Sequence, residues 1–166
     1  MVYLDNAATS FPKPPEVYDR VLSFMRESCA NPGRSSHEMA RASANCIMKT
    51  RESLCQLFNI SNPLQIGFTP NATLALNMAI YGTLKKGDHV ITTALEHNSV
   101  LRPLYELKKN GVIDYTVVTP KNHFGTIETQ SITRAVRTNT KLIVVTASSN
   151  VIGAILPYGE SGDAAK

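Results

Sequence analysis

Short β-rich segments alternate with helical segments through most of the chain, and this alternation constrains the fold more than any other sequence feature. The pattern predicts strands over 65–69, 89–93, 112–119 and 141–146, and helices over 71–83, 99–110 and 128–137. Short strands separated by helices of this length are typical of βαβ units and a mostly parallel sheet. Leu142–Val145 is entirely apolar, as expected for a strand buried on both faces. The sequence therefore predicts an α/β fold.

The two ends of the chain follow different patterns. Tyr3–Pro15 contains three prolines and several small residues, which predicts an extended arm. We expect a helix from about Glu16, since prolines suit a first helical turn, then a loop over Asn31–Ser36 and a long helix over Ser36–Phe58. Asp163–Lys166 has the composition of a helix interior, which predicts a truncated chain. The alternative is the frayed last helix of a complete small protein.

Composition and charge narrow the class of protein. Hydrophobic residues make up 43% of the chain and charged residues 18%, which excludes a disordered chain. The net charge is +4, but the densest basic pairs, Lys85–Lys86 and Lys108–Lys109, fall at expected helix ends, where cations complement the helix dipole. We therefore expect no nucleic-acid partner. No run approaches the ~18 apolar residues of a membrane helix, and no signal peptide is visible, so we expect no membrane association.

The cysteines argue against a metal site. Cys29, Cys46 and Cys55 are odd in number and lack the spacing of metal ligands. Cys46 and Cys55 fall in a helical pattern and are expected to be small buried apolar residues in a reducing compartment. The sequence therefore predicts a cytoplasmic protein without a bound metal.

Three loops after predicted strands carry residues suited to a ligand, and parallel sheets bind ligands at the carboxyl ends of their strands. In the first loop, Asn71 is a good helix cap, and Ala72 and Thr73 begin the helix. The free N–H groups and the dipole of a first helical turn favour a phosphate, and Thr73 adds a hydroxyl donor. Plain capping without a ligand is the alternative.

The second loop carries His97 and the third carries Asn150. An imidazole can stack on a flat ligand or move a proton, an amide donates and accepts at once, and Gly153 permits a close backbone approach. The alternatives are an exposed loop histidine, with Asn98 capping the next helix, and an ordinary turn around Asn150. Together, the three loops suit an aromatic phosphorylated ligand.

Five motifs, in order along nearly the whole chain, resemble those of the cysteine desulfurases and related class V aminotransferases. They are Tyr3–Thr9, Asn31–His37, Phe68–Asn77, Glu96–Val100 and Ser149–Pro157. The resemblance implies a pyridoxal 5'-phosphate (PLP) enzyme with a three-layer αβα large domain of the PLP-transferase type. It further implies that residues 1–30 are an arm and helix of the small domain and that residues 31–166 are an incomplete large domain.

The same resemblance implies the site residues. Ala72 and Thr73 would hold the cofactor phosphate. His97 would stack on the pyridine ring and act in catalysis by assisting proton transfer, and Asn150 would hydrogen-bond the phenolic oxygen of the ring. Residues expected to line the substrate entrance are Asn6, Ala7, Ala8, Thr9, Arg34 and His37.

The implied reaction converts L-cysteine to L-alanine and transfers the sulfur to an enzyme cysteine, in a homodimer that can pass sulfur to an acceptor protein. Several family residues have no counterpart here. No lysine follows the Ser/Thr-x-His pattern of the Schiff-base lysine, the aspartate facing the pyridine nitrogen is missing, and none of the cysteines matches the persulfide-forming one. Leu74 replaces an acid that is usually not a cofactor ligand. We therefore expect this chain alone to be inactive.

The resemblance is also compatible with other functions. The parent protein is alternatively another class V aminotransferase, a selenocysteine lyase or an epimerase-like enzyme. A non-catalytic binding module that kept this part of the fold is the alternative outside the enzymes.

Overall fold

The computed structural model describes residues 2–6, 8–33, 36–163 and 165. The chain divides into two compact units, Met1–Phe68 and Thr69–Lys166, and each is described by itself. The division expected from the resemblance, 1–30 and 31–166, concerns the domains of a whole enzyme and stays a prediction. Among the described residues, no helix is both long enough and apolar enough to span a membrane.

The first unit contains two helices, α1 (Pro15–Glu27) and α2 (Glu38–Phe58), and a 3₁₀ turn, η1 (Pro63–Gln65). Pro15 occupies the first turn of α1, where its missing N–H group is not needed. Both helices begin within two residues of their expected starts. Cys55 is buried in α2, as expected, whereas Cys46 is half-buried.

The strand predicted over 65–69 is wrong. Gln65 closes η1, and no strand forms in the residues after it. A strand requires a neighbour for its N–H and C=O groups, and this stretch pairs with none of the three strands that the structure describes. Phe68 instead lies under the guanidinium of Arg51, 5.7 Å from its ring centre. The first of the three expected ligand loops therefore begins a helix without following a strand.

The second unit is built from βα repeats. Its elements are α3 (Ala72–Thr83), β1 (His89–Thr93), α4 (Asn98–Lys109), β2 (Asp114–Val118), α5 (Thr129–Arg134), β3 (Thr140–Ile143) and α6 (Tyr158–Asp163). The strands form a parallel sheet in the order β2-β1-β3. The expected strands over 112–119 and 141–146 and the helix over 128–137 are present but shorter than predicted.

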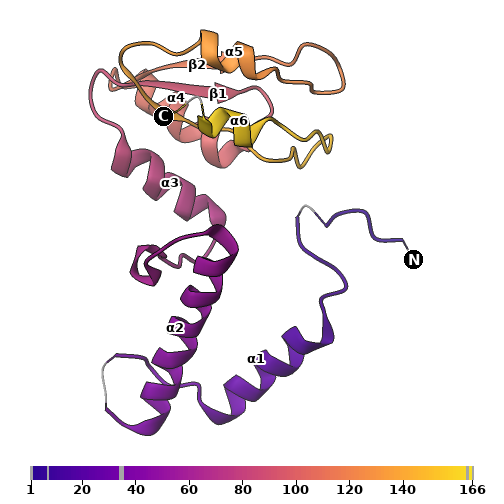
Figure 1. Ribbon diagram of the computed structural model, residues 1–166, viewed down its shortest axis with the longest axis vertical. Coiled ribbons are helices and arrows are strands. Elements are labelled where there is room, and N and C mark those ends of the chain that lie inside the picture. Colours follow the sequence, from indigo (N-terminus) through magenta and orange to yellow (C-terminus); the bar gives the residue numbers. More distant parts are fainter. Residues whose placement is uncertain (1, 7, 34–35, 164, 166) are drawn as a thin grey trace. The chain divides into compact units, whose positions relative to one another are not determined.

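Successive residues of the central strand, β1, face two separate apolar clusters. Val90 packs with Ile80 of α3 and Leu104 of α4. Ile91 packs with Ile132 of α5 and with Leu156, just before α6. Figure 1 shows α4 and α5 on opposite sides of the strands. Helices thus cover both faces of a parallel sheet, which confirms the predicted α/β fold with three layers.

A buried histidine links all three strands at their amino ends. His89 is completely buried, and its Nδ1 and Nε2 lie 2.8 Å from Thr140 Oγ1 on β3 and 2.9 Å from Thr116 Oγ1 on β2. Burial lowers the pKa of His89 from its ordinary value of 6.5, the nearby Arg137 and Lys108 lower it further, and Asp114 opposes them. The neutral form of the imidazole is therefore favoured at the amino end of the central strand.

We expect acid to destabilise the second unit through His89. A histidine pKa that is lower in the folded state means that the unfolded chain binds the proton more readily. The free energy of unfolding should therefore fall as the pH drops below about 6.5, in urea titrations at pH 7.5 and 5.5. In His89→Gln this dependence should shrink, whereas replacing the exposed His123 by Gln should leave it unchanged.

Titration of the Asp114 carboxylate does not contribute to the expected change in unfolding free energy between pH 7.5 and 5.5. Lys108 and Arg137 hold the pKa of Asp114 well below its ordinary value of 3.8, so its stabilisation is lost only at lower pH. An unfolding free energy equal at pH 7.5 and 5.5 in the unaltered chain would contradict the role given to His89.

Candidate functional site

The amino end of α3 leaves backbone donors free. The Asn71 side chain caps this helix, since its Oδ1 accepts from the N–H of Leu74 at 2.9 Å. Thr69 Oγ1 donates to the carbonyl oxygen of Asn71 at 2.8 Å and fixes the approach to the helix. Within the described part of the chain, the exposed Ala72 and Thr73 have no acceptor for their N–H groups. These are the donors that a first helical turn offers to an anion.

His97, which the sequence places at a ligand site, caps the amino end of α4. His97 Nδ1 accepts from the N–H of Ser99 at 3.1 Å and lies 2.8 Å from Ser99 Oγ. Because Nδ1 is an acceptor here, the neutral ring carries its proton on Nε2. The alternative in which Asn98 caps this helix is wrong, since Asn98 is the first residue of the helix itself.

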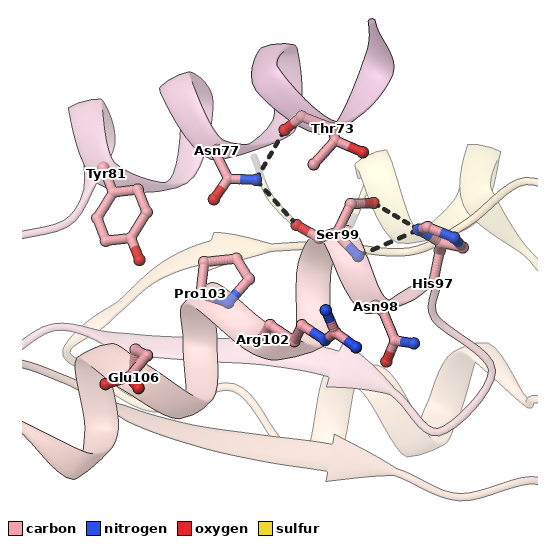
Figure 2. A pocket seen from close by; sticks show the side chains of 9 residues that line it. All are labelled: Thr73, Asn77, Tyr81, His97, Asn98, Ser99, Arg102, Pro103 and Glu106. Atoms are coloured by element: carbon pink, nitrogen blue, oxygen red, sulfur yellow. Dashed lines mark hydrogen bonds between the residues drawn. The ribbon is translucent and has the colours of Figure 1, made fainter.

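One side chain joins these two helix ends. Asn77 Nδ2 donates to the carbonyl oxygen of Thr73 at 2.7 Å and to that of Ser99 at 3.4 Å. Figure 2 shows Asn77 reaching from α3 to α4 with Thr73 and His97 at the same end of the helix pair. The amide thus fixes α3 against α4 next to the candidate site.

A pocket of about 300 Å³ lies along this helix pair. Its lining residues are Thr73, Asn77, Tyr81, His97, Asn98, Ser99, Arg102, Pro103 and Glu106. The structure therefore brings together two side chains that the sequence placed in separate loops, Thr73 and His97. The wall carries two opposite charges, the guanidinium of Arg102 and the carboxylate of Glu106.

The third loop forms the turn given above as the alternative to a ligand site, and the Asn150 amide does not line the pocket. Gly153 N donates to the carbonyl oxygen of Ser149, and Ser149 N donates to that of Ala154. Gly153 has φ +69°, a conformation that glycine adopts readily. Asn150 is exposed within this turn, and its role stays a prediction.

The residues expected at a substrate entrance belong to the first unit. Asn6, Ala8 and Thr9 lie in an exposed arm, in which Asn6 Oδ1 accepts from the N–H of Phe11. His37 caps α2 by accepting from the N–H of Ala40. Ala7 and Arg34 lie outside the described residues. The entrance role of all six stays a prediction.

Glu96 is a residue that inspection of the sequence did not single out. Its Oε1 accepts from the hydroxyl of Thr93 at 3.0 Å and from the N–H of Thr146 at 2.6 Å. Burial raises the pKa of the Glu96 carboxyl, and these two hydrogen bonds oppose the rise. Glu96 thus ties the loop of His97 to the segment that leads to Asn150. No group of three or more potential metal ligands gathers in the described ranges.

Comparison with known proteins gives consistent matches over nearly the whole chain. The family model for aminotransferase class-V matches residues 2–166. The cysteine desulfurase IscS of Dictyoglomus turgidum is 35% identical, over 99% of this chain and 42% of that protein. The mitochondrial cysteine desulfurase of Candida maltosa is 35% identical, over 97% of this chain and 33% of that protein.

Solved structures of related proteins also resemble this chain over nearly its whole length. The apo cysteine desulfurase of Thermococcus onnurineus has a TM-score of 0.87 and 25% identity, over 99% of this chain and 41% of that chain. SspA in complex with cysteine has a TM-score of 0.86 and 32% identity, over 99% of this chain and 47% of that chain. The chain thus spans less than half the length of each of these relatives.

Proposed function

Because this chain belongs to the class V aminotransferase and cysteine desulfurase family, we propose that it carries the phosphate-binding and ring-stacking part of a PLP site. The observation that supports this most is the shared pocket of Thr73 and His97. Its volume of about 300 Å³ is at the lower end of the range for small-molecule sites.

The residues present fit the cofactor. The N–H groups of Ala72 and Thr73 and the Thr73 hydroxyl suit a phosphate dianion, which the helix dipole also favours. The imidazole of His97 is exposed at one end of the pocket and is held by Ser99, which suits stacking on an aromatic ring. Asn150 is proposed to bond the phenolic oxygen.

In the proposed mechanism, the residues of this chain bind and orient the cofactor and assist proton transfer. When bound, PLP supplies the electron sink for bond breaking at the α-carbon of an amino acid. Ala72 and Thr73 anchor the phosphate. His97 is proposed to hold the ring and to assist proton transfer. Asn6 to Thr9, Arg34 and His37 are proposed to border the substrate entrance.

The proposed reaction of the whole protein is that of a cysteine desulfurase. L-cysteine becomes L-alanine, and its sulfur passes to the thiol of an enzyme cysteine outside this chain as a persulfide. The names of the matched relatives support L-cysteine as substrate. We further propose a cytoplasmic homodimer that passes sulfur to an acceptor protein. Cys29, Cys46 and Cys55 are not assigned the persulfide role, and the chain alone is proposed to be inactive.

Transamination is the second candidate, because the matching family model is that of the class V aminotransferases. Assay of the whole protein separates the two. With dithiothreitol present to reduce the enzyme persulfide and release its outer sulfur, sulfide and alanine formed in equal amounts from L-cysteine support the desulfurase. Formation of a keto acid without sulfide supports the aminotransferase.

The cofactor site is tested with a PLP relative that cannot react with lysine. Pyridoxine 5'-phosphate keeps the ring and the phosphate but lacks the aldehyde, so lysine adducts do not form. We expect the chain to bind it at least about tenfold more tightly than pyridoxine, which lacks the phosphate, because a phosphate at a helix amino end gains charge-assisted hydrogen bonds. Titration of the ligand fluorescence gives both affinities, and equal affinities would argue against the phosphate site.

A further inference from the structure

At the carboxyl end of the β1–β3 pairing, a side chain takes the place of a backbone hydrogen-bond acceptor. Val144 N donates to the carbonyl oxygen of Ile91 on β1. In a parallel ladder the donors that face one neighbour recur at every second residue, so Thr146 N is expected to pair with Thr93. Instead, Thr146 N donates to Glu96 Oε1 at 2.6 Å. A carboxylate therefore replaces the next backbone acceptor.

The carboxylate is fixed from the β1 side as well. The same Oε1 accepts from the hydroxyl of Thr93, whose oxygen in turn accepts from the N–H of Leu95 at 3.2 Å. In the described part of the chain, Glu96 forms no ion pair with a lysine, arginine or histidine. A half-buried carboxylate without a cation gains little stability, and its raised pKa reflects that cost.

The position of Glu96 in the sheet is the one where such folds bind ligands. The chain leaves β1 for β2 on one side and returns to β3 on the other. Ligands of open α/β sheets bind outside the carboxyl ends of the strands, at this change of direction. Glu96 lies between the two strand ends. His97 is its neighbour in sequence, and Thr146 Oγ1 donates to the carbonyl oxygen of Ser148 on the other side.

We propose that Glu96 is a positioning residue that ends the β1–β3 pairing, holds the two strand ends apart, and orients His97 and the segment 147–150 on either side of the ligand. The part that concerns the ligand rests on the proposed PLP site. The part that concerns the strand ends does not depend on it.

Two substitutions at this position separate positioning from stability. Glu96→Gln keeps an acceptor oxygen for both donors. Glu96→Met keeps the side-chain length but removes the acceptor, which leaves the donors of Thr93 and Thr146 unpaired, so urea titration of each variant establishes that it is folded before the other measurements. The control is Glu128→Ala, which removes an exposed carboxylate whose partner is the exposed Lys121.

The first measurement is amide hydrogen exchange by NMR. We expect Glu96→Met to lose the protection of the Thr146 amide and to shift the ring signals of His97, while the Val144 amide stays protected. Glu96→Gln and Glu128→Ala should retain both features. An unchanged Thr146 amide in Glu96→Met would overturn the proposal.

The second measurement is the affinity for pyridoxine 5'-phosphate. Glu96→Met should lower it about tenfold, comparable to the smallest losses seen when a group that orients a metal-binding histidine is removed, while Glu96→Gln stays within about threefold of the unaltered chain. Equal affinity in Glu96→Met overturns the inference and leaves the PLP site standing. If the unaltered chain does not bind the probe, the PLP site fails, and the Thr146 and His97 signals alone decide the role of Glu96.

Discussion

Replacing Thr73 with glutamate should lower the affinity for pyridoxine 5'-phosphate by at least about tenfold, because like charges about 4 Å apart repel by about 4 kcal/mol near a protein surface, and about 1.4 kcal/mol is already a tenfold change in affinity. Thr73 is in the first turn of α3 and lines the pocket. The substitution also removes the hydroxyl donor. An acidic residue in a first helical turn stabilises the helix, so the fold should remain intact.

The matched control is Leu74→Glu, which adds the same charge one residue further along. Leu74 is exposed and does not line the pocket, and successive helix residues point in different directions. We expect the affinity of Leu74→Glu for pyridoxine 5'-phosphate to stay within about threefold of the unaltered chain. The added charge changes only the electrostatic potential at the amino end of the helix. Fluorescence titration measures both variants, and equal losses would assign the effect to net charge alone.

Replacing Leu104 with alanine should destabilise the second unit by about 2–5 kcal/mol, the range for removing a buried leucine side chain. Leu104 is completely buried in the cluster that joins α3, α4 and β1. A domain is commonly stable by only about 5–15 kcal/mol, so this loss is a large fraction of the total. The midpoint of urea unfolding, followed by circular dichroism, measures it.

The control for this substitution is the next residue on the same helix. Tyr105 is 59% exposed, so Tyr105→Ala should change the free energy of unfolding by less than about 1 kcal/mol, as is usual for surface positions. Similar losses in the two variants would contradict the position given to Leu104 in the core.

The sequence was most informative where packing and local pattern agree. The strand over 89–93 was predicted to the residue, because every one of its side chains is buried and β-rich residues fill it. The helix over 71–83 was predicted within one residue, since Asn71 is both a good cap by type and the cap in the structure. The shared site of Thr73 and His97 follows from the same boundaries.

The errors arise where tertiary contacts decide. The segment 65–69 has a strand-like composition, but it finds no partner strand among the described residues. The strand predicted over 141–146 ends at Ile143, because Thr146 donates its N–H to the Glu96 carboxylate. Asn77 and Glu96 were not singled out, since their hydrogen bonds join segments far apart in the sequence. Spacing alone carries no signal for such contacts.

The strand order has a consequence for synthesis on the ribosome. The central strand, β1, is made first, and both of its hydrogen-bonding edges remain unpaired until β2 and then β3 emerge. At about 5–20 residues per second, β1 spends seconds as an unpaired strand. Of the described elements of the second unit, only α3 precedes it to cover one face, so a nascent chain stopped after β1 should bind chaperones more strongly than one stopped after β3.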